Sequence, residues 1–259
     1  MEPRAVSAVH GWAWIVEGYK LFRKSPALWL ALLLLLFAST RVLLAIPGLG
    51  LVVVVLMPLF IVGLMEGCRA LERGGRLELG HLLAGFRKNA PRLATIGGVS
   101  LVGNLVLMMI VMEIGGEAIT ALMKSVAKGA AMTPQLAQEM QAATRTVARA
   151  LLVAMAVTLP LFMALWYAPL LVYFNDLSPL GAMKRSLIAC VKNTGAMLVY
   201  GAVIVAGILI AIPVTTALGQ YEFTLFLLAP VVVPSIYASY KDIFLAGTAP
   251  QAETDSVAG

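Results

Sequence analysis

The sequence predicts an all-α membrane protein with six transmembrane helices, arranged as three hairpins that each follow a cytoplasmic, interfacial amphipathic helix. The first observation is the composition, with 61% hydrophobic and only 12% charged residues and a mean hydropathy of +0.92. The charged share is about half that of an ordinary soluble domain. The second observation is a set of apolar runs of roughly twenty residues, which as helices would cross about 30 Å of hydrocarbon.

The clearest of these runs form a hairpin that begins after Pro26. Residues 27–46 and 51–67 are both apolar, and Pro47-Gly48-Leu49-Gly50 lies between them as a turn. Pro58 removes one backbone hydrogen bond from the second arm and is expected to kink it.

The remaining spans follow from the same criterion of length and hydropathy. The six predicted spans are residues 27–46, 51–67, 93–114, 150–173, 196–218 and 223–240, within one transmembrane domain of residues 1–245. The third span is rich in small residues, including Gly97 and Gly103, which predicts close packing against a neighbouring helix. Between the third and fourth spans the chain is expected to leave the membrane. Thr133-Pro134 there is typical of a helix start, and this helix can continue into the fourth span. Residues 246–259 are small and polar and are predicted to be disordered.

Three segments have the apolar periodicity of amphipathic helices, and each precedes one hairpin. They cover residues 11–24, 79–86 and 180–192, and each ends in basic residues followed by a helix breaker. In the first, Trp and Tyr are expected to lie at headgroup depth. The pattern indicates three units of one design, which either reflects duplication or the shared need of every entering helix for a basic anchor and a turn. All three units point the same way, which disfavours an inverted repeat.

The distribution of cations predicts the orientation of the spans. Of the 19 Lys and Arg residues, those on the opposite side are Arg41, Lys124, Lys128, Arg145 and Arg149. By the positive-inside rule, both termini are expected in the cytoplasm and residues 115–149 outside it. The predicted location is therefore the bacterial inner membrane.

Motifs for chemistry are absent from the sequence. The two histidines and the two cysteines, Cys68 and Cys190, lack the close spacing of metal ligands, and no phosphate-binding glycine loop, nucleophile elbow or HExxH motif occurs. Both cysteines fall on the cytoplasmic side, so no disulfide is expected. We expect no enzymatic activity, no cofactor and no metal.

Candidate binding residues come instead from charge and from polar groups at membrane depth. The cations beside the spans predict contact with anionic lipid headgroups, rather than nucleic acid, or with a partner protein. The candidate rim consists of Lys20, Arg23, Lys24, Arg87, Lys88, Lys184, Arg185 and Lys192. Arg41 and Asn104 are intramembrane polar candidates. Arg41 either snorkels or pairs near the outer surface, or serves transport. Asn104 either hydrogen-bonds a neighbouring helix or lines a path.

Three segments resemble an uncharacterised family of proteobacterial multi-pass inner-membrane proteins. They are Gly11-Trp12-Ala13-Trp14-Ile15-Val16-Glu17-Gly18 with Leu21-Phe22-Arg23-Lys24-Ser25-Pro26, then Cys68-Arg69-Ala70-Leu71-Glu72-Arg73-Gly74 with Leu77-Glu78-Leu79-Gly80-His81, and Tyr237-Ala238-Ser239-Tyr240-Lys241-Asp242-Ile243-Phe244. The layout is also distantly similar to the membrane-anchor domain of some bacterial glycerophosphodiester phosphodiesterases. The resemblance implies a location and a fold, without a substrate or catalytic residues.

Two functions remain open from the sequence. The first is a non-enzymatic membrane protein that associates with lipid or a partner protein through the basic residues. The second is a transporter for a small solute or a lipid, whose path would be lined by Asn104, Arg41 and the proline-kinked helices. A cavity at mid-membrane depth would favour transport, and a tightly packed bundle would favour association.

Overall fold

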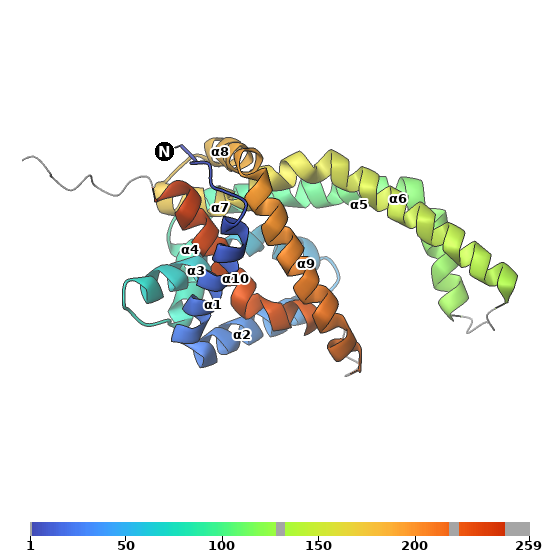
Figure 1. Ribbon diagram of the computed structural model, residues 1–259, viewed down its shortest axis with the longest axis horizontal. Helices are drawn as coiled ribbons and strands as arrows, with labels where there is room; N and C mark the ends of the chain where they lie inside the picture. The colour runs from blue at the N-terminus through green and yellow to red at the C-terminus, as the bar shows by residue number, and fades with distance from the viewer. Residues whose placement is uncertain (1, 128–132, 218–222, 247–259) are drawn as a thin grey trace, which may run out of the picture.

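The computed structural model describes residues 2–127, 133–217 and 223–246, and every regular element in these ranges is helical (Figure 1). The α-helices in chain order are α1 (His10–Lys24), α2 (Pro26–Leu44), α3 (Leu49–Glu72), α4 (Ala84–Arg87), α5 (Ala90–Ala127), α6 (Pro134–Trp166), α7 (Ala168–Asn175), α8 (Pro179–Lys192), α9 (Thr194–Ala217) and α10 (Phe223–Phe244). A short 3₁₀-helix, η1 (Leu79–Leu83), precedes α4.

The helices form a body from which one long antiparallel hairpin extends (Figure 1). The hairpin consists of α5 with 38 residues and α6 with 33. At about 1.5 Å per residue, α5 is roughly 57 Å long, which exceeds the hydrocarbon thickness of a bilayer. The helix is therefore longer than a single perpendicular membrane crossing requires.

Within the described residues, five segments are long and apolar enough to cross a membrane. They are Pro26–Leu44, Leu49–Glu72, Ala90–Ser125, Pro134–Asn175 and Thr194–Ala217. Only 17% of the first window and 11% of the last are buried inside the protein, so most of their apolar surface faces outward, as lipid-facing helices do. The first five predicted spans fall on these segments. The sixth, residues 223–240, falls on α10, which is not among the five.

The main core lies at one end of the body, around the C-terminal half of α10. Tyr240, Ile243 and Phe244 of α10 are almost fully buried. The ring of Phe244 packs edge-on against the buried Tyr167 ring at 5.5 Å between centroids. Aromatic packing between two segments far apart in sequence thus fastens α10 to the break between α6 and α7.

Helix α1 contributes Trp14 to this core, although its Trp and Tyr residues were expected at headgroup depth. Trp14 is 2% exposed, whereas Trp12 and Tyr19 are 55% and 48% exposed and keep the predicted surface position. The helix packs on α10 at Gly18, where an added Cβ would lie 2.6 Å from the Val231 carbonyl oxygen. The absence of a side chain there brings the two backbones into contact.

The small-residue face of α5 packs as predicted. A Cβ on Gly97 would lie 2.0 Å from the Val55 carbonyl oxygen of α3, and one on Gly103 would lie 2.6 Å from the Leu161 side chain of α6. Gly115 also faces α6, with its Cβ position 3.1 Å from the Cβ of Ala150. Gly115 therefore does not end the helix, and α5 continues to Ala127 as a partner of α6.

The junctions before the three hairpins differ in backbone conformation. Ser25, Asn89 and Asn193 each lie between an amphipathic segment and the helix that follows it. The carbonyl oxygen of each accepts a hydrogen bond from the backbone N–H four residues later, as the residue before an α-helix ordinarily does. Their φ angles are −154°, 60° and −115°, so the predicted repetition of one unit stays a prediction.

The amphipathic segments and the predicted helix start differ in how closely they follow expectation. The third segment forms α8 over Pro179–Lys192, with Ser178 as its N-cap. The second is not one α-helix but the 3₁₀-helix η1 followed by the four-residue α4. At α6, the Thr133 hydroxyl accepts a hydrogen bond from the Leu136 N–H, so the predicted start at Thr133-Pro134 is confirmed.

Candidate functional site

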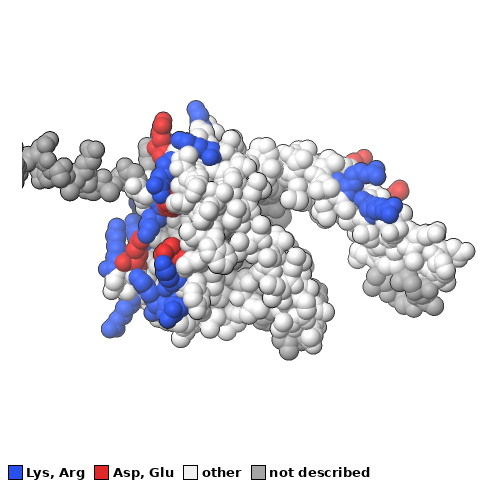
Figure 2. All heavy atoms as spheres, viewed as in Figure 1, with Lys and Arg blue, Asp and Glu red and all other residues white. Residues whose placement is uncertain are grey.

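Charged side chains gather at one end of the molecule and reappear on the far part of the α5–α6 hairpin, with an uncharged surface between them in this view (Figure 2). We call the first group the charged end; α1, α4 with the residue that follows it, and α8 contribute its predicted basic residues. These are Lys20, Arg23, Lys24, Arg87, Lys88, Lys184, Arg185 and Lys192, here called the basic rim. All are exposed except Arg185, which is half-buried.

Several members of the basic rim also form contacts with other residues of the protein. Lys88 pairs with Asp176 at 3.1 Å, and Lys192 donates a hydrogen bond to the Pro3 carbonyl oxygen at 3.0 Å. The guanidinium of Arg23 lies 5.9 Å from the centre of the Tyr19 ring. Exposed contacts of this kind contribute little stability individually, so these cations stay available to a ligand of opposite charge.

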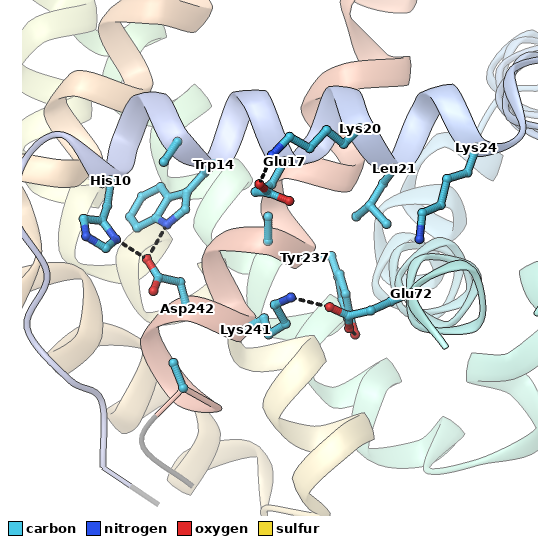
Figure 3. A pocket seen from close by; sticks show the side chains of 13 residues that line it. His10, Trp14, Glu17, Lys20, Leu21, Lys24, Glu72, Tyr237, Lys241 and Asp242 are labelled. Carbon is cyan, nitrogen blue, oxygen red and sulfur yellow. Dashed lines mark hydrogen bonds and ion pairs between the residues drawn. The ribbon is translucent and has the colours of Figure 1, made fainter. Parts of the chain in front are cut away.

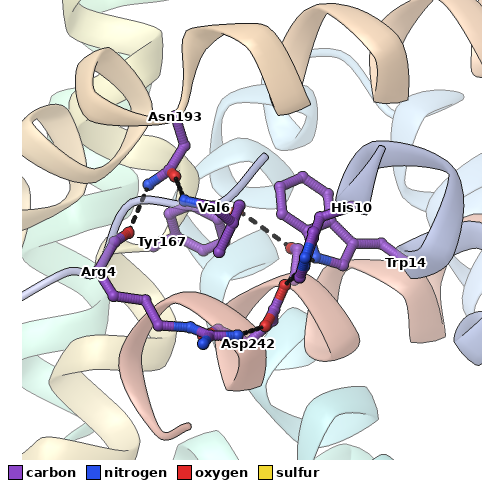
Figure 4. A network of polar contacts seen from close by, with 8 residues as sticks. Arg4, Val6, His10, Trp14, Tyr167, Asn193 and Asp242 are labelled. Atoms are coloured by element: carbon purple, nitrogen blue, oxygen red, sulfur yellow. Dashed lines mark hydrogen bonds and ion pairs between the residues drawn. The ribbon is translucent and has the colours of Figure 1, made fainter. Parts of the chain in front are cut away.

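Asp242, near the end of α10, is the centre of a polar network that the sequence did not reveal (Figure 4). Its carboxylate accepts a hydrogen bond from the Trp14 indole N–H at 2.8 Å, lies 2.6 Å from His10 Nδ1, and forms an ion pair with Arg4. Burial raises the pKa of Asp242, but the hydrogen bonds from Trp14, His10 and Arg4 outweigh it, so the pKa is lower than usual.

Asn193 fastens the N-terminal segment from the other side (Figure 4). Its side chain is buried, accepts a hydrogen bond from the Val6 N–H at 2.8 Å, and donates to the Arg4 carbonyl oxygen at 3.0 Å. The residues before α1 are thereby held between the end of α10 and the α8–α9 junction. The attachment requires a side chain that both donates and accepts a hydrogen bond, as the amide of Asn193 does.

A cavity of about 380 Å³ lies between α1, the end of α3 and the end of α10 (Figure 3). Charges of both signs line it, namely Lys20, Lys24 and Lys241 with Glu17, Glu72 and Asp242, and His10 lies beside them. Trp14, Leu21 and Tyr237 supply apolar surface. We call it the α1–α10 cavity.

The carboxylates in this cavity differ in how firmly they are held. Glu72 accepts a hydrogen bond from the Tyr237 hydroxyl at 2.9 Å and pairs with Lys241. Glu17 pairs with Lys20 one turn away at 2.6 Å, and both side chains are more than half exposed. Lys24 donates to the Leu71 carbonyl oxygen at 2.9 Å. The exposed side of the cavity, formed by Glu17 and Lys20, is called its outer half, and the ion pair there contributes little stability.

A second polar cavity of about 290 Å³ involves two further rim residues. It lies beside Glu66 and Tyr173 and is lined by Arg87 and Lys88. Next to it, Asp176 accepts hydrogen bonds from Asn89 at 2.9 Å and Lys88 at 3.1 Å, which lower its pKa. Asp176, which follows α7, is thereby joined to Asn89 at the start of α5.

The two intramembrane candidates lie away from the charged end. Arg41 is exposed in the last turn of α2. Asn104 does not bond a neighbouring helix as expected, because its amide donates to the Ser100 carbonyl oxygen of its own helix at 2.8 Å. It lines a cavity of about 300 Å³ together with Pro58 of α3 and Pro169 of α7.

The potential metal ligands and the two thiols are the remaining candidates for chemistry. Among the described side chains, no three His, Cys, Asp or Glu residues are grouped so that they could hold a metal ion. Cys68 and Cys190 are both buried free thiols.

Five membrane-capable helices and a charged end define a multi-pass membrane protein with an all-helical fold. The chain is 28% identical over 255 residues to a probable inner membrane protein of Burkholderia thailandensis, a match that covers 92% of each chain. No family model matches the sequence, and no solved structure matches it. The relative is consistent with the expected family of uncharacterised inner-membrane proteins. The distant similarity to phosphodiesterase membrane anchors stays a prediction.

Proposed function

We propose that this protein is a non-enzymatic inner-membrane protein that associates with anionic phospholipid headgroups through the basic rim. In this proposal the charged end lies at the cytoplasmic leaflet, both termini are cytoplasmic, α10 is the sixth span, and the far part of the α5–α6 hairpin projects to the other side. The basic residues near the surface of an anionic leaflet each contribute about 1 kcal/mol of attraction.

The observation that supports this proposal best is the position of the rim. Seven of its eight cations come from α1, α4 and α8, and the eighth, Lys88, directly follows α4; these elements immediately precede the three hairpins. Figure 2 places the charged end directly beside the uncharged surface. Cations at that boundary are at headgroup depth when the apolar helices are in lipid.

Extraction of the protein in mild detergent, followed by identification of the bound lipids and proteins, tests the proposal. We expect anionic phospholipid to be enriched over the bulk membrane. Lys184→Gln combined with Lys192→Gln and Arg23→Gln should reduce the enrichment by at least tenfold, since each cation contributes about 1 kcal/mol. Lys124→Gln with Arg145→Gln, on the hairpin, is the matched control and should leave it unchanged. Equal losses in both variants, or a stoichiometric protein in place of lipid, would contradict headgroup binding.

Orientation is tested separately with reporter fusions. A reporter active only in the cytoplasm should be active when fused after Lys241 and silent when fused near residue 132. The reverse pattern would place the charged end at the outer leaflet and contradict the proposed orientation.

Transport of a small solute or lipid is the alternative, and the cavity beside Asn104 favours it. Pro58 and Pro169 have no N–H to offer the Val54 and Leu165 carbonyls, and all four residues line this cavity. Polar groups therefore gather where spans α3, α5 and α6–α7 meet. If the protein transports a solute, Asn104→Leu should abolish flux in reconstituted vesicles, whereas Arg41→Leu should only lower stability.

A further inference from the structure

We propose that the α1–α10 cavity binds the headgroup of an aminophospholipid, a phosphodiester that carries a primary amine. This inference rests on the proposed function, because Lys20 and Lys24 belong to the basic rim, and it names the lipid class and the site. The cavity has the two charges that such a headgroup requires, at the depth where headgroups lie.

The depth follows from the elements that form the cavity. Lys24 is the last residue of α1, and the first membrane-capable helix begins two residues later at Pro26. Glu72 is the last residue of α3, the second membrane-capable helix. Both side chains line the cavity. The cavity is thus at the ends of two spans, where the hydrocarbon meets the headgroups.

The inner half of the cavity consists of Asp242 and Glu72, whose charges are already paired within the protein. Asp242 is held by Arg4, His10 and Trp14, and Glu72 by Lys241 and Tyr237. These contacts fasten the end of α10 to α1 and α3. We therefore assign them to the wall of the site and not to ligand binding.

The outer half contains the groups that can exchange partners. Glu17 and Lys20 form a solvent-exposed pair within one helix, a kind of contact that contributes little stability. The primary ammonium of a headgroup can replace Lys20 at Glu17, and Lys20 can then turn with Lys24 toward the phosphate. Figure 3 shows Lys20 and Lys24 on successive turns of α1 above the cavity. After this exchange the ammonium is paired with Glu17, and two lysines oppose the single negative charge of the phosphate.

Trp14, Leu21 and Tyr237 favour a lipid over a soluble phosphate. They provide apolar surface beside the charged groups, which suits the glycerol end of a phospholipid at the interface. A quaternary amine fits this site poorly, because it has no N–H to donate to the Glu17 carboxylate.

Native mass spectrometry of the full-length protein with added phosphatidylethanolamine, phosphatidylcholine or phosphatidylglycerol tests the proposal. The wild-type protein should retain phosphatidylethanolamine about tenfold more than phosphatidylcholine, as expected for one charge-assisted hydrogen bond. Glu17→Gln should bring this ratio close to one. Lys20→Gln combined with Lys24→Gln should reduce retention of both phosphatidylethanolamine and phosphatidylglycerol about tenfold. Soluble phosphoethanolamine should not displace the lipid.

Lys124→Gln combined with Arg145→Gln is the matched control, because it removes two exposed cations from α5 and α6, outside both the cavity and the basic rim. Lys184→Gln removes a rim cation from α8 and separates binding by the whole rim from binding in the cavity. All of the substitutions are at exposed helical positions, and size-exclusion elution and circular dichroism verify the fold. Equal retention of the ethanolamine and choline lipids, or full displacement by soluble phosphoethanolamine, overturns the proposal. If Lys184→Gln reduces retention as much as the Lys20 and Lys24 changes, the cavity is wrong and the basic rim stands. If no rim variant changes retention, both proposals fail.

Discussion

Two adjacent glycines of α5 offer a sharp test of how the membrane-capable helices pack. An added Cβ on Gly97 would lie 2.0 Å from the Val55 carbonyl oxygen and 2.7 Å from its Cα, whereas one on Gly98 has no described neighbour within 4 Å. The atoms that Gly97→Ala would strike are backbone atoms, which no rotamer change can move away. Gly98→Ala changes the same chemistry one residue along and is therefore its control.

The expected difference between the two variants is large. Overpacking costs typically 1–3 kcal/mol, and we place Gly97→Ala at about 3 kcal/mol because the contact is with backbone. The change from Gly to Ala in a helix returns roughly 1 kcal/mol in both variants. We expect Gly97→Ala to lower the free energy of unfolding by about 2 kcal/mol and Gly98→Ala to raise it by up to ~1 kcal/mol.

Unfolding by SDS titration in mixed micelles, followed by circular dichroism, measures this difference. A separation of about 3 kcal/mol corresponds to more than a hundredfold in the unfolding equilibrium. If Gly97→Ala and Gly98→Ala unfold at the same SDS fraction, α3 and α5 do not touch at Gly97, and the packing described here is wrong.

Three further predictions concern single polar contacts. Asn193→Ala should cost about 1–3 kcal/mol and expose the residues before α1 to proteolysis, which limited digestion with mass spectrometry would detect. Folding lowers the pKa of Asp242, so the stabilisation from its carboxylate is present above the ordinary value of 3.8 and is lost as the pH falls through the folded pKa. Asp242→Asn should remove this stabilisation at neutral pH and abolish the acid dependence. Thermal unfolding between pH 3 and 7 measures both effects. Thr133→Ala should cost about 1 kcal/mol and speed hydrogen exchange at the Leu136 amide.

Features set by local sequence were predictable here. Five spans follow from apolar length alone, and the α6 and α8 starts follow from Thr133 and Ser178, whose hydroxyls cap the next turn. The packing role of Gly97 was also predictable, because close helix approach requires small residues. The spans and the helix starts depend on residues within a few positions of each other, whereas the small residues of α5 indicate a close contact without naming the partner helix.

Features that depend on distant residues were not predictable. Trp14 has the sequence context of an interfacial residue, yet it is buried because Asp242, 228 positions away, accepts its N–H. The third predicted span ends at residue 114, yet α5 continues to Ala127 and Gly115 packs against Ala150 of α6. No single-sequence pattern contains these pairings. At the site, the rim was visible as charge, but the α1–α10 cavity was not, since α3 and α10 close it.

In the proposed topology the apolar helices are in lipid and the charged end is at the inner leaflet. Labelling of single cysteine variants with a membrane-impermeant thiol reagent tests it directly, since the native thiols of Cys68 and Cys190 are buried. We expect Lys124→Cys to react in intact spheroplasts, Lys184→Cys to react only after lysis, and Ile210→Cys to stay unlabelled in both, although Ile210 is 75% exposed in the protein. Labelling of Ile210→Cys in the folded protein would mean that water, not lipid, covers α9, and would contradict the account.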